Sequence, residues 1–211
     1  MGTKIAGCDP QLRQQIAQMS ARLMMQEGIE DYHLAKSKAA SQLGIYHSRN
    51  LPSNREIQEE IQIYQRLFYG DTQPIRLQHL RRVALEVMKF LAVYSPRLVG
   101  SVLSGTATQH SKITLHLFAH SAEEIAVFLL ERNIPYQVSE KRFHFSEKRM
   151  HLSDGVICPC YRFIAGEETV MLIVFDINDI RWSPPNPVDG KPMARADVKI
   201  LERLIEENIN A

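Results

Sequence analysis

The chain has few cysteines, a single tryptophan and almost no surplus of charge. Its 211 residues include 3 cysteines, and 25 Lys and Arg stand against 24 Asp and Glu, for a net charge of +1. An odd and small number of cysteines argues against a disulfide framework and favours a reducing compartment. The balanced charge gives no indication of a nucleic-acid partner.

Long apolar runs are absent as well. No stretch is long enough to cross a bilayer, and residues 1–10 lack the apolar centre of a secretory signal. We therefore expect a cytoplasmic protein with no membrane partner. Cys158-Pro159-Cys160 lacks the Cys-x-x-Cys spacing of zinc or redox motifs, so two small residues of a strand beside a proline are expected there.

Residues 1–94 show the apolar periodicity of helices, and we predict four of them. The third begins at Ser53-Asn54-Arg55-Glu56, the pattern of a capping box. Basic runs such as Arg81-Arg82 are expected on solvated helix faces. The four helices are predicted at about residues 10–28, 31–44, 53–70 and 75–94.

From Ser95 onward the pattern changes to short apolar strands. Ser183-Pro184-Pro185-Asn186-Pro187 predicts a stiff, extended linker. The predicted domains are therefore an N-terminal helical region (1–94), a sheet domain (95–182) and a proline-rich linker with a helix that packs back (183–211). Within the last two, strands are predicted at 98–103, 113–118, 135–145, 155–164 and 169–175, and helices at 122–132 and 195–208.

One turn and the strand after it carry the chain's most specific pattern. Gly100-Ser101 follows an apolar strand, and Ser111-Lys112-Ile113-Thr114-Leu115 opens the next one. This arrangement resembles the DNA-polymerase-β-like nucleotidyltransferase superfamily, whose members place Gly-Ser or Gly-Gly after the first strand and a Ser-Asp-x-Asp segment shortly afterwards. The resemblance covers the middle half of the chain. It implies an α+β or α/β fold with a nucleotidyltransferase-like mixed sheet and flanking helices.

The resemblance also implies a loss of catalysis. Nucleotidyl transfer uses two Mg²⁺ ions held by carboxylates, and alternate residues of a strand project from the same face. Lys112 and Thr114 occupy the positions that match the two aspartates. An ammonium group repels a divalent cation, so we expect no metal site and no cofactor.

The small and hydroxyl residues of the turn remain suited to an anion. Backbone N–H groups in a tight turn bind phosphate without a metal, and Lys112 adds a cation. An ordinary tight turn packed against a helix is the alternative. His116 shares the strand face of Thr114 and is expected to line the cleft. His110 and His120 lie too far along the chain to complete a zinc site. The candidate ligand-binding residues are Gly100, Ser101, Ser104, Gly105, Ser111, Lys112, Thr114 and His116.

Three functions stay open at this point. The leading one is a catalytically degenerate nucleotidyltransferase that binds a nucleotide or another phosphate ligand, or acts in regulation. The second is an active, Mg²⁺-dependent nucleotidyltransferase with carboxylates at Asp154, Asp176 or Asp179, of which Asp176 is the candidate catalytic residue, although a turn beginning there is the simpler interpretation. The third is a protein–protein interaction module that binds its partner through the N-terminal helices and has a filled cleft.

Overall fold

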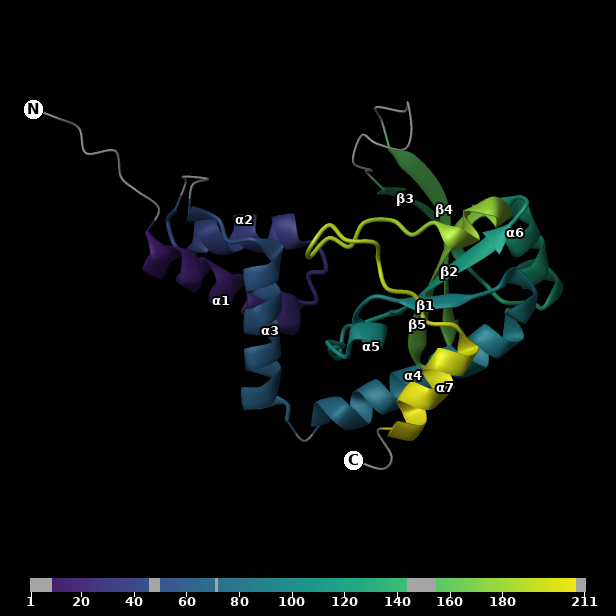
Figure 1. The fold of residues 1–211 in the computed structure, drawn as a ribbon, viewed down its shortest axis with the longest axis horizontal. Helices are drawn as coiled ribbons and strands as arrows, with labels where there is room; N and C mark the ends of the chain where they lie inside the picture. The colour runs from purple at the N-terminus through teal and green to yellow at the C-terminus, as the bar shows by residue number, and fades with distance from the viewer. Residues whose placement is uncertain (1–8, 46–49, 71, 144–154, 208–211) are drawn as a thin grey trace, which may run out of the picture. The chain divides into compact units, whose positions relative to one another are not determined.

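The computed structural model of the chain describes residues 9–45, 50–70, 72–143 and 155–207. The described residues form an α+β structure that contains one five-stranded mixed sheet (Figure 1). The chain divides into two compact units. A helical unit comprises Met1–Gln73 with Thr108–His110 and Pro187–Asp189, and a sheet unit comprises Pro74–Ala107, Ser111–Asn186 and Gly190–Ala211.

The helical unit contains α1 (Pro10–Glu27), α2 (Tyr32–Gln42) and α3 (Asn54–Phe68). The Asp9 side chain caps α1 by accepting from backbone N–H groups, and Gly28 ends the helix at φ 69°. The capping box predicted at Ser53 and Glu56 is confirmed at the start of α3. Small side chains of α1 allow close packing on α3, and that cluster contains Ala17, Ala21, Met25, Ile57 and Ile61.

The sheet unit begins with α4 (Thr72–Phe90), whose first two residues belong to the helical unit, and a 3-10 turn, Ala92–Tyr94. The strands lie in the order β1-β2-β5-β4-β3, with β2 and β5 parallel and the other neighbours antiparallel. Their bounds are β1 (Arg97–Val99), β2 (Ile113–Ala119), β3 (Gln137–Phe143), β4 (Val156–Ala165) and β5 (Glu168–Asp176). The remaining elements are α5 (Ser101–Ser104), α6 (Ala122–Glu131), η3 (Ile177–Arg181) and α7 (Val198–Glu207).

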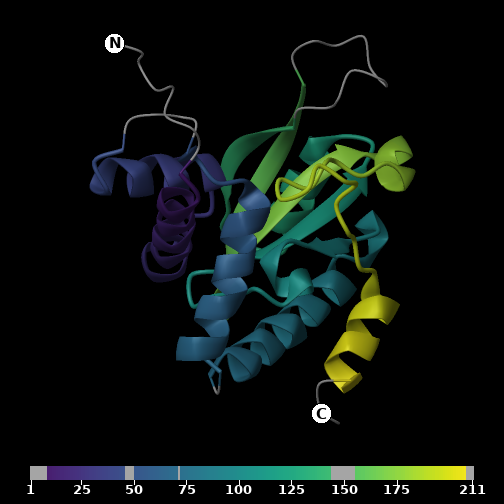
Figure 2. The ribbon, with the colours of Figure 1, turned by 60° about the vertical axis from the view of Figure 1, so that its left-hand side comes forward.

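One face of the sheet, here called the first face, packs against helices. Figures 1 and 2 show α4 and α7 on one side of the strands. Buried residues of α4, α6 and α7 share one cluster with Leu98, Leu115 and Leu172 from three strands. The sequence pattern places α4 with the N-terminal helices, whereas its buried side chains pack on the sheet. The reason is its apolar stripe, which includes Leu77, Leu80, Ala84, Val87 and Met88.

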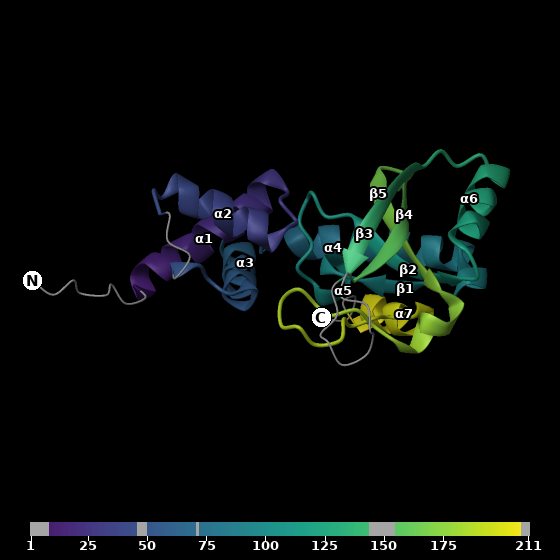
Figure 3. The ribbon, with the colours of Figure 1, turned by 90° about the horizontal axis from the view of Figure 1, so that it is seen from above.

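The opposite face, here called the second face, is covered in part by the chain that follows β5. Seen from above, α6 and this segment lie on opposite sides of the strands (Figure 3). The second face is aromatic and contains thiols: its buried cluster is Phe118, Phe143, Cys158, Cys160, Ile173 and Phe175. Ile180 and Trp182 pack against it from the segment after β5.

Three sequence expectations need correction here. The strand predicted at 98–103 ends at Val99, because Gly100 has φ 77° and ψ −154° and turns the chain into α5. The helix predicted to Tyr94 stops at Phe90 and continues as a 3-10 turn. The linker predicted as extended doubles back: Met193 N–H donates to the Pro184 carbonyl at 2.8 Å.

Arg81 is a further correction, because this side chain is buried instead of solvated. Its Nε donates to the Val102 carbonyl and its Nη2 to the Leu103 carbonyl, each at 3.2 Å. Burial lowers the pKa of its guanidinium group. These hydrogen bonds satisfy carbonyls of the short helix α5, which has too few residues to satisfy them itself. Arg81 therefore supports the turn that carries Gly100 and Ser101, a role that no local sequence pattern indicates.

Candidate ligand-binding site

The turn after β1 has a backbone that only glycine adopts readily. Gly100 combines φ 77° with ψ −154°, a region essentially restricted to glycine. A Cβ at this residue would meet no atom within 4 Å, so the space beside it is open. Ser101 Oγ donates to Ser111 Oγ at 3.2 Å, and Ser104 Oγ lies 2.9 Å from Thr106 Oγ1. Gly105 ends α5 at φ 82°.

Strand β2 alternates as the sequence predicts. Ile113, Leu115 and Leu117 belong to the helix-packed core, whereas Phe118 belongs to the cluster on the second face. Thr114 and His116 share the parity of Phe118 and so project from the second face. Thr114 is partly exposed and His116 is fully buried. The expectation that His116 lines an open cleft is therefore wrong.

The register places the Gly-Ser turn beside one end of the second face. Directly paired residues project from the same face, and Thr114 pairs with Val99 on one side and with Met171 on the other. The same row continues through Arg162 to Gln137 on the outer strands. Arg162 and Gln137 are exposed, and Arg162 Nη2 donates to Gln137 Oε1 at 2.6 Å. We call this row, together with Lys112 and the Gly100 turn, the open half.

The next rows form the closed half. Arg97, His116, Ile173, Cys160 and Ser139 are successive partners across the sheet. His116 Nδ1 accepts from Arg195 Nε at 3.0 Å, and the two residues are 79 positions apart in the chain. Burial first, and Arg195 second, lower the pKa of His116 to about 2. Arg195 was not among the residues that the sequence indicated, and no local signal marks it.

The row of Thr114 consists of described residues, and none of them is a carboxylate. Met171 occupies the position next to Thr114 on the parallel strand β5. Within the described ranges, no group of three or more His, Cys, Asp or Glu side chains could hold a metal ion. The described part of the chain thus brings one cation, Arg162, and no anion to the row of Thr114.

The alternative carboxylates do not gather at the open half. Asp176 pairs with Ala119, five positions from the Thr114 pair, which is about 17 Å along the strand. Asp176 begins a turn, as its simpler interpretation predicts, because its Oδ1 accepts from Asn178 N at 2.8 Å and so lowers the pKa of Asp176. Asp179 follows in η3, where burial raises its pKa. Asp154 lies outside the described residues.

The two described cysteines are structural. Cys158 and Cys160 are both buried in the second-face cluster. Burial raises the pKa of the Cys158 thiol to about 12 and also raises that of Cys160. Because the thiolate is the reactive form, neither is a nucleophile at neutral pH.

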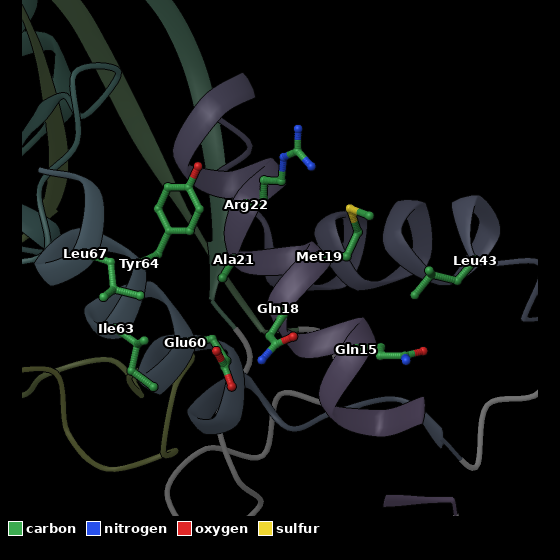
Figure 4. Close-up of a pocket in the computed structure, with 10 residues that line it drawn as sticks. All are labelled: Gln15, Gln18, Met19, Ala21, Arg22, Leu43, Glu60, Ile63, Tyr64 and Leu67. Atoms are coloured by element: carbon green, nitrogen blue, oxygen red, sulfur yellow. The ribbon is translucent and has the colours of Figure 1, made fainter. Parts of the chain in front are cut away.

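A separate open groove lies within the helical unit. Its walls are α1 and α3, with Leu43 at the end of α2, and Figure 4 shows Ile63, Tyr64 and Leu67 on the α3 side. The next residue of α3, Phe68, is 65% exposed, and Leu67 is 71% exposed. Arg22 on α1 and Glu60 on α3 are its two charged lining residues. This groove was not anticipated from the sequence, because the helical pattern there shows only which residues face inward.

Comparison of the chain with models of known protein families, with curated proteins and with solved structures finds no match. Within the described residues, no helix combines the length and apolar character that a bilayer crossing requires. The function must therefore be argued from the site itself.

Proposed function

We propose that the sheet unit is a nucleotidyltransferase-like domain that binds a phosphate-bearing ligand, such as a nucleotide, and does not turn it over. The observation that carries the proposal is the turn at Gly100, whose backbone conformation and open side leave room for a ligand next to Lys112 and Thr114. Glycine at such a position allows a ligand to approach the backbone closely.

The charges of the open half support an anionic ligand. Lys112 and Arg162 bring two cations to this end of the second face, and Ser101, Ser111 and Thr114 bring hydroxyl groups. Lysine is a point charge that binds phosphate without strict geometry, and arginine binds it through two N–H groups. In this proposal the two cations take the charge-neutralising part that metal ions take in the active family, so binding does not need Mg²⁺.

A thermal-shift series tests the proposal. We expect ATP, ADP or inorganic triphosphate to raise Tm by about 3 to 6 °C at a tenfold excess over Kd, in EDTA as well as in Mg²⁺. Lys112→Gln should reduce that shift, and the exposed Lys199→Gln on α7 is its matched control. If none of the three ligands shifts Tm, or if Lys112→Gln leaves the shift unchanged, the proposal fails.

Glycine substitutions supply a second arm. Gly100→Ala should abolish the ligand shift because its methyl group enters the open space. Gly190→Ala is the control, since Gly190 also has a positive φ of 70° and no neighbour within 4 Å of its Cβ position. Both should lose stability, by about 1 to 3 kcal/mol, because alanine is strained at positive φ. Only Gly100→Ala should lose the ligand response.

The register also predicts how a metal site could be restored. Lys112→Asp and Thr114→Asp recreate the family's pair, and Met171→Asp adds the third carboxylate on the strand beside it. We expect Mn²⁺ binding by calorimetry in the triple variant and none in the native chain. The double variant that keeps Met171 should bind Mn²⁺ more weakly, because β5 then brings no carboxylate to this face. Glu168 and Asp176 are three and five positions from Met171, and strand alternation directs both to the opposite face. Equal affinity of the two variants would contradict the assignment of Met171 to the third position.

The groove of the helical unit favours a second candidate function, self-association of the chain. Two grooves related by a two-fold axis would bury Leu67 and Phe68 and bring the Arg22 of each copy near the Glu60 of the other. Figure 4 shows these two charged residues on different helices of the groove.

Sedimentation at several concentrations tests this candidate. We expect a dimer that Leu67→Glu dissociates, whereas Leu130→Glu, at an apolar residue of α6 that is 61% exposed, leaves it intact. A monomer at every concentration, or equal effects of both substitutions, would reject it.

A further inference from the structure

The guanidinium group of Arg195 connects the segment that follows β5 to the second face. Arg195 Nε donates to His116 Nδ1 on β2, and its Nη1 donates to the carbonyls of Ile180 and Trp182. The same group lies 5.0 Å from the Phe118 ring centre and 5.3 Å from that of Phe175. Arg195 therefore joins the residues just after β5 and those just before α7 to the middle of the sheet. The part of this stretch that belongs to the sheet unit, residues 177–186 and 190–196, is here called the cover segment.

The hydrogen bond to Arg195 fixes the proton on His116. Arginine Nε–H is always a donor, so the Nδ1 that it contacts must be an unprotonated acceptor. The neutral ring then carries its proton on Nε2, which is buried and has no partner among the described residues. Arg195 Nη2 is likewise buried without a described partner. Protonation of Nδ1 would turn the acceptor into a donor and break the bond.

The cations around His116 oppose a positive charge on its imidazole ring. Arg97 stands beside it on β1, Arg195 faces it from the cover segment, and Lys141 on β3 acts on it from the outer strands. A protonated His116 would be a fourth cation in a site with little water to screen it. His116 therefore stays neutral while the cover segment is in place.

The other groups that face His116 do not offset this repulsion. Phe143 and Phe175 contact the ring, and Cys160 of the same row carries a protonated thiol. Asp179 of η3 is partly buried, and its carboxylate attracts the guanidinium group of Arg195. Asp179 therefore does not stabilise a positive charge on the His116 imidazole. If the hydrogen bond from Arg195 to His116 breaks, Arg195 and Asp179 can move away from the sheet together with the rest of the cover segment.

The cover segment also contacts the sheet at points other than Arg195. Ile180 and Trp182 pack on the aromatic cluster, and two backbone hydrogen bonds join Leu98 and Ala196 at 2.8 and 3.0 Å. Bonds such as the one from Met193 N to the Pro184 carbonyl lie within the segment. A segment outside the core strands and helices can open locally at a lower free energy than global unfolding requires.

We propose that the cover segment, residues 177–186 and 190–196, is a pH-sensitive cover over the closed half of the second face, latched by the Arg195–His116 hydrogen bond and released when His116 takes up a proton. Release exposes the aromatic cluster and frees Arg195. Opening of the cover segment does not require a ligand at the open half, so the tests of this proposal are independent of the tests of the proposed function.

Native-state hydrogen exchange followed by NMR measures this opening directly. The amides of Met193 and Ala196 report on the cover segment, and the amide of the fully buried Leu172 on β5 is the reference for global unfolding. We expect the two cover amides to open more often than Leu172. With a pKa near 6.5 for the exposed ring, their opening constant should rise about 75-fold from pH 6 to pH 4.

Two variants assign the effect. In His116→Gln the side-chain oxygen still accepts from Arg195 but does not titrate, so the pH dependence of the cover amides should disappear. His120→Gln is the matched control, because His120 follows the same strand and is exposed. The proposal is overturned if His116→Gln keeps the pH dependence, or if the cover amides exchange only as fast as Leu172.

The native chain gives an independent test that requires no variant. The ring ¹⁵N shifts of His116 should show Nδ1 unprotonated and Nε2 protonated, unchanged from pH 8 to pH 5. A His116 ring that titrates near its ordinary pKa, or that carries its proton on Nδ1, contradicts the latch.

Discussion

Both faces of the sheet bury side chains, but the two buried clusters differ in residue type. The first face is buried under helices by aliphatic residues, with Tyr161 and Phe163 as its aromatic members from the strands. The second face buries aromatic rings, two thiols and an imidazole, and Arg195 from the cover segment donates a hydrogen bond to that imidazole. Apolar contacts are non-directional and tolerate many solutions, whereas buried polar groups need specific partners. The first face therefore stabilises the fold, and the second face is where regulation and binding are expected.

The difference between the faces is tested most strongly by truncating adjacent residues of β2 that project in opposite directions. Leu115→Ala removes a fully buried side chain of the first face and should destabilise the fold by about 2 to 5 kcal/mol in urea unfolding. Thr114→Ala, one residue earlier on the open half, should change stability by less than about 0.5 kcal/mol. Similar losses for both would show that the two faces are equally packed.

The next largest effect is expected on the pH dependence of stability, because the second face buries His116. The pKa of His116 is lowered in the folded chain to about 2. At a pH below the ordinary histidine pKa of about 6.5, the unfolded chain therefore binds this proton and the folded chain does not. Stability is complete above about pH 6.5 and falls as pH decreases, by about 2 kcal/mol from pH 7 to pH 5. Urea unfolding at both pH values measures this loss. His116→Gln should remove that part of the loss and His120→Gln should not.

The smallest effect is expected at the outer edge of the open half. Arg162 is exposed and bonded to the exposed Gln137, so Arg162→Gln should cost less than about 0.5 kcal/mol. Chemical unfolding at neutral pH provides the measurement. A loss above about 1 kcal/mol would mean that this row is packed and that the division into open and closed halves is wrong.

Local patterns anticipated a large part of the fold. The capping box at Ser53 and the alternation of β2 were both readable, because each depends on residues within one turn or one strand. The turn at Gly100 was also placed correctly at the end of a strand. The sequence allowed Asp176 to be either a catalytic carboxylate or the first residue of a turn, and in the structure it begins a turn. Strand register decides which residues share a row, and local patterns contain no register between distant strands.

Periodicity and residue type predicted most of the helices and strands, apart from the strand expected at 98–103, and the face on which each β2 side chain projects. These signals act over a few neighbouring positions. Tertiary packing was needed to establish that His116 is buried, that Arg81 supports α5 and that Arg195 reaches across the second face. Each of these depends on a hydrogen bond between residues at least 21 positions apart, and such partners are selected by the packing of whole elements.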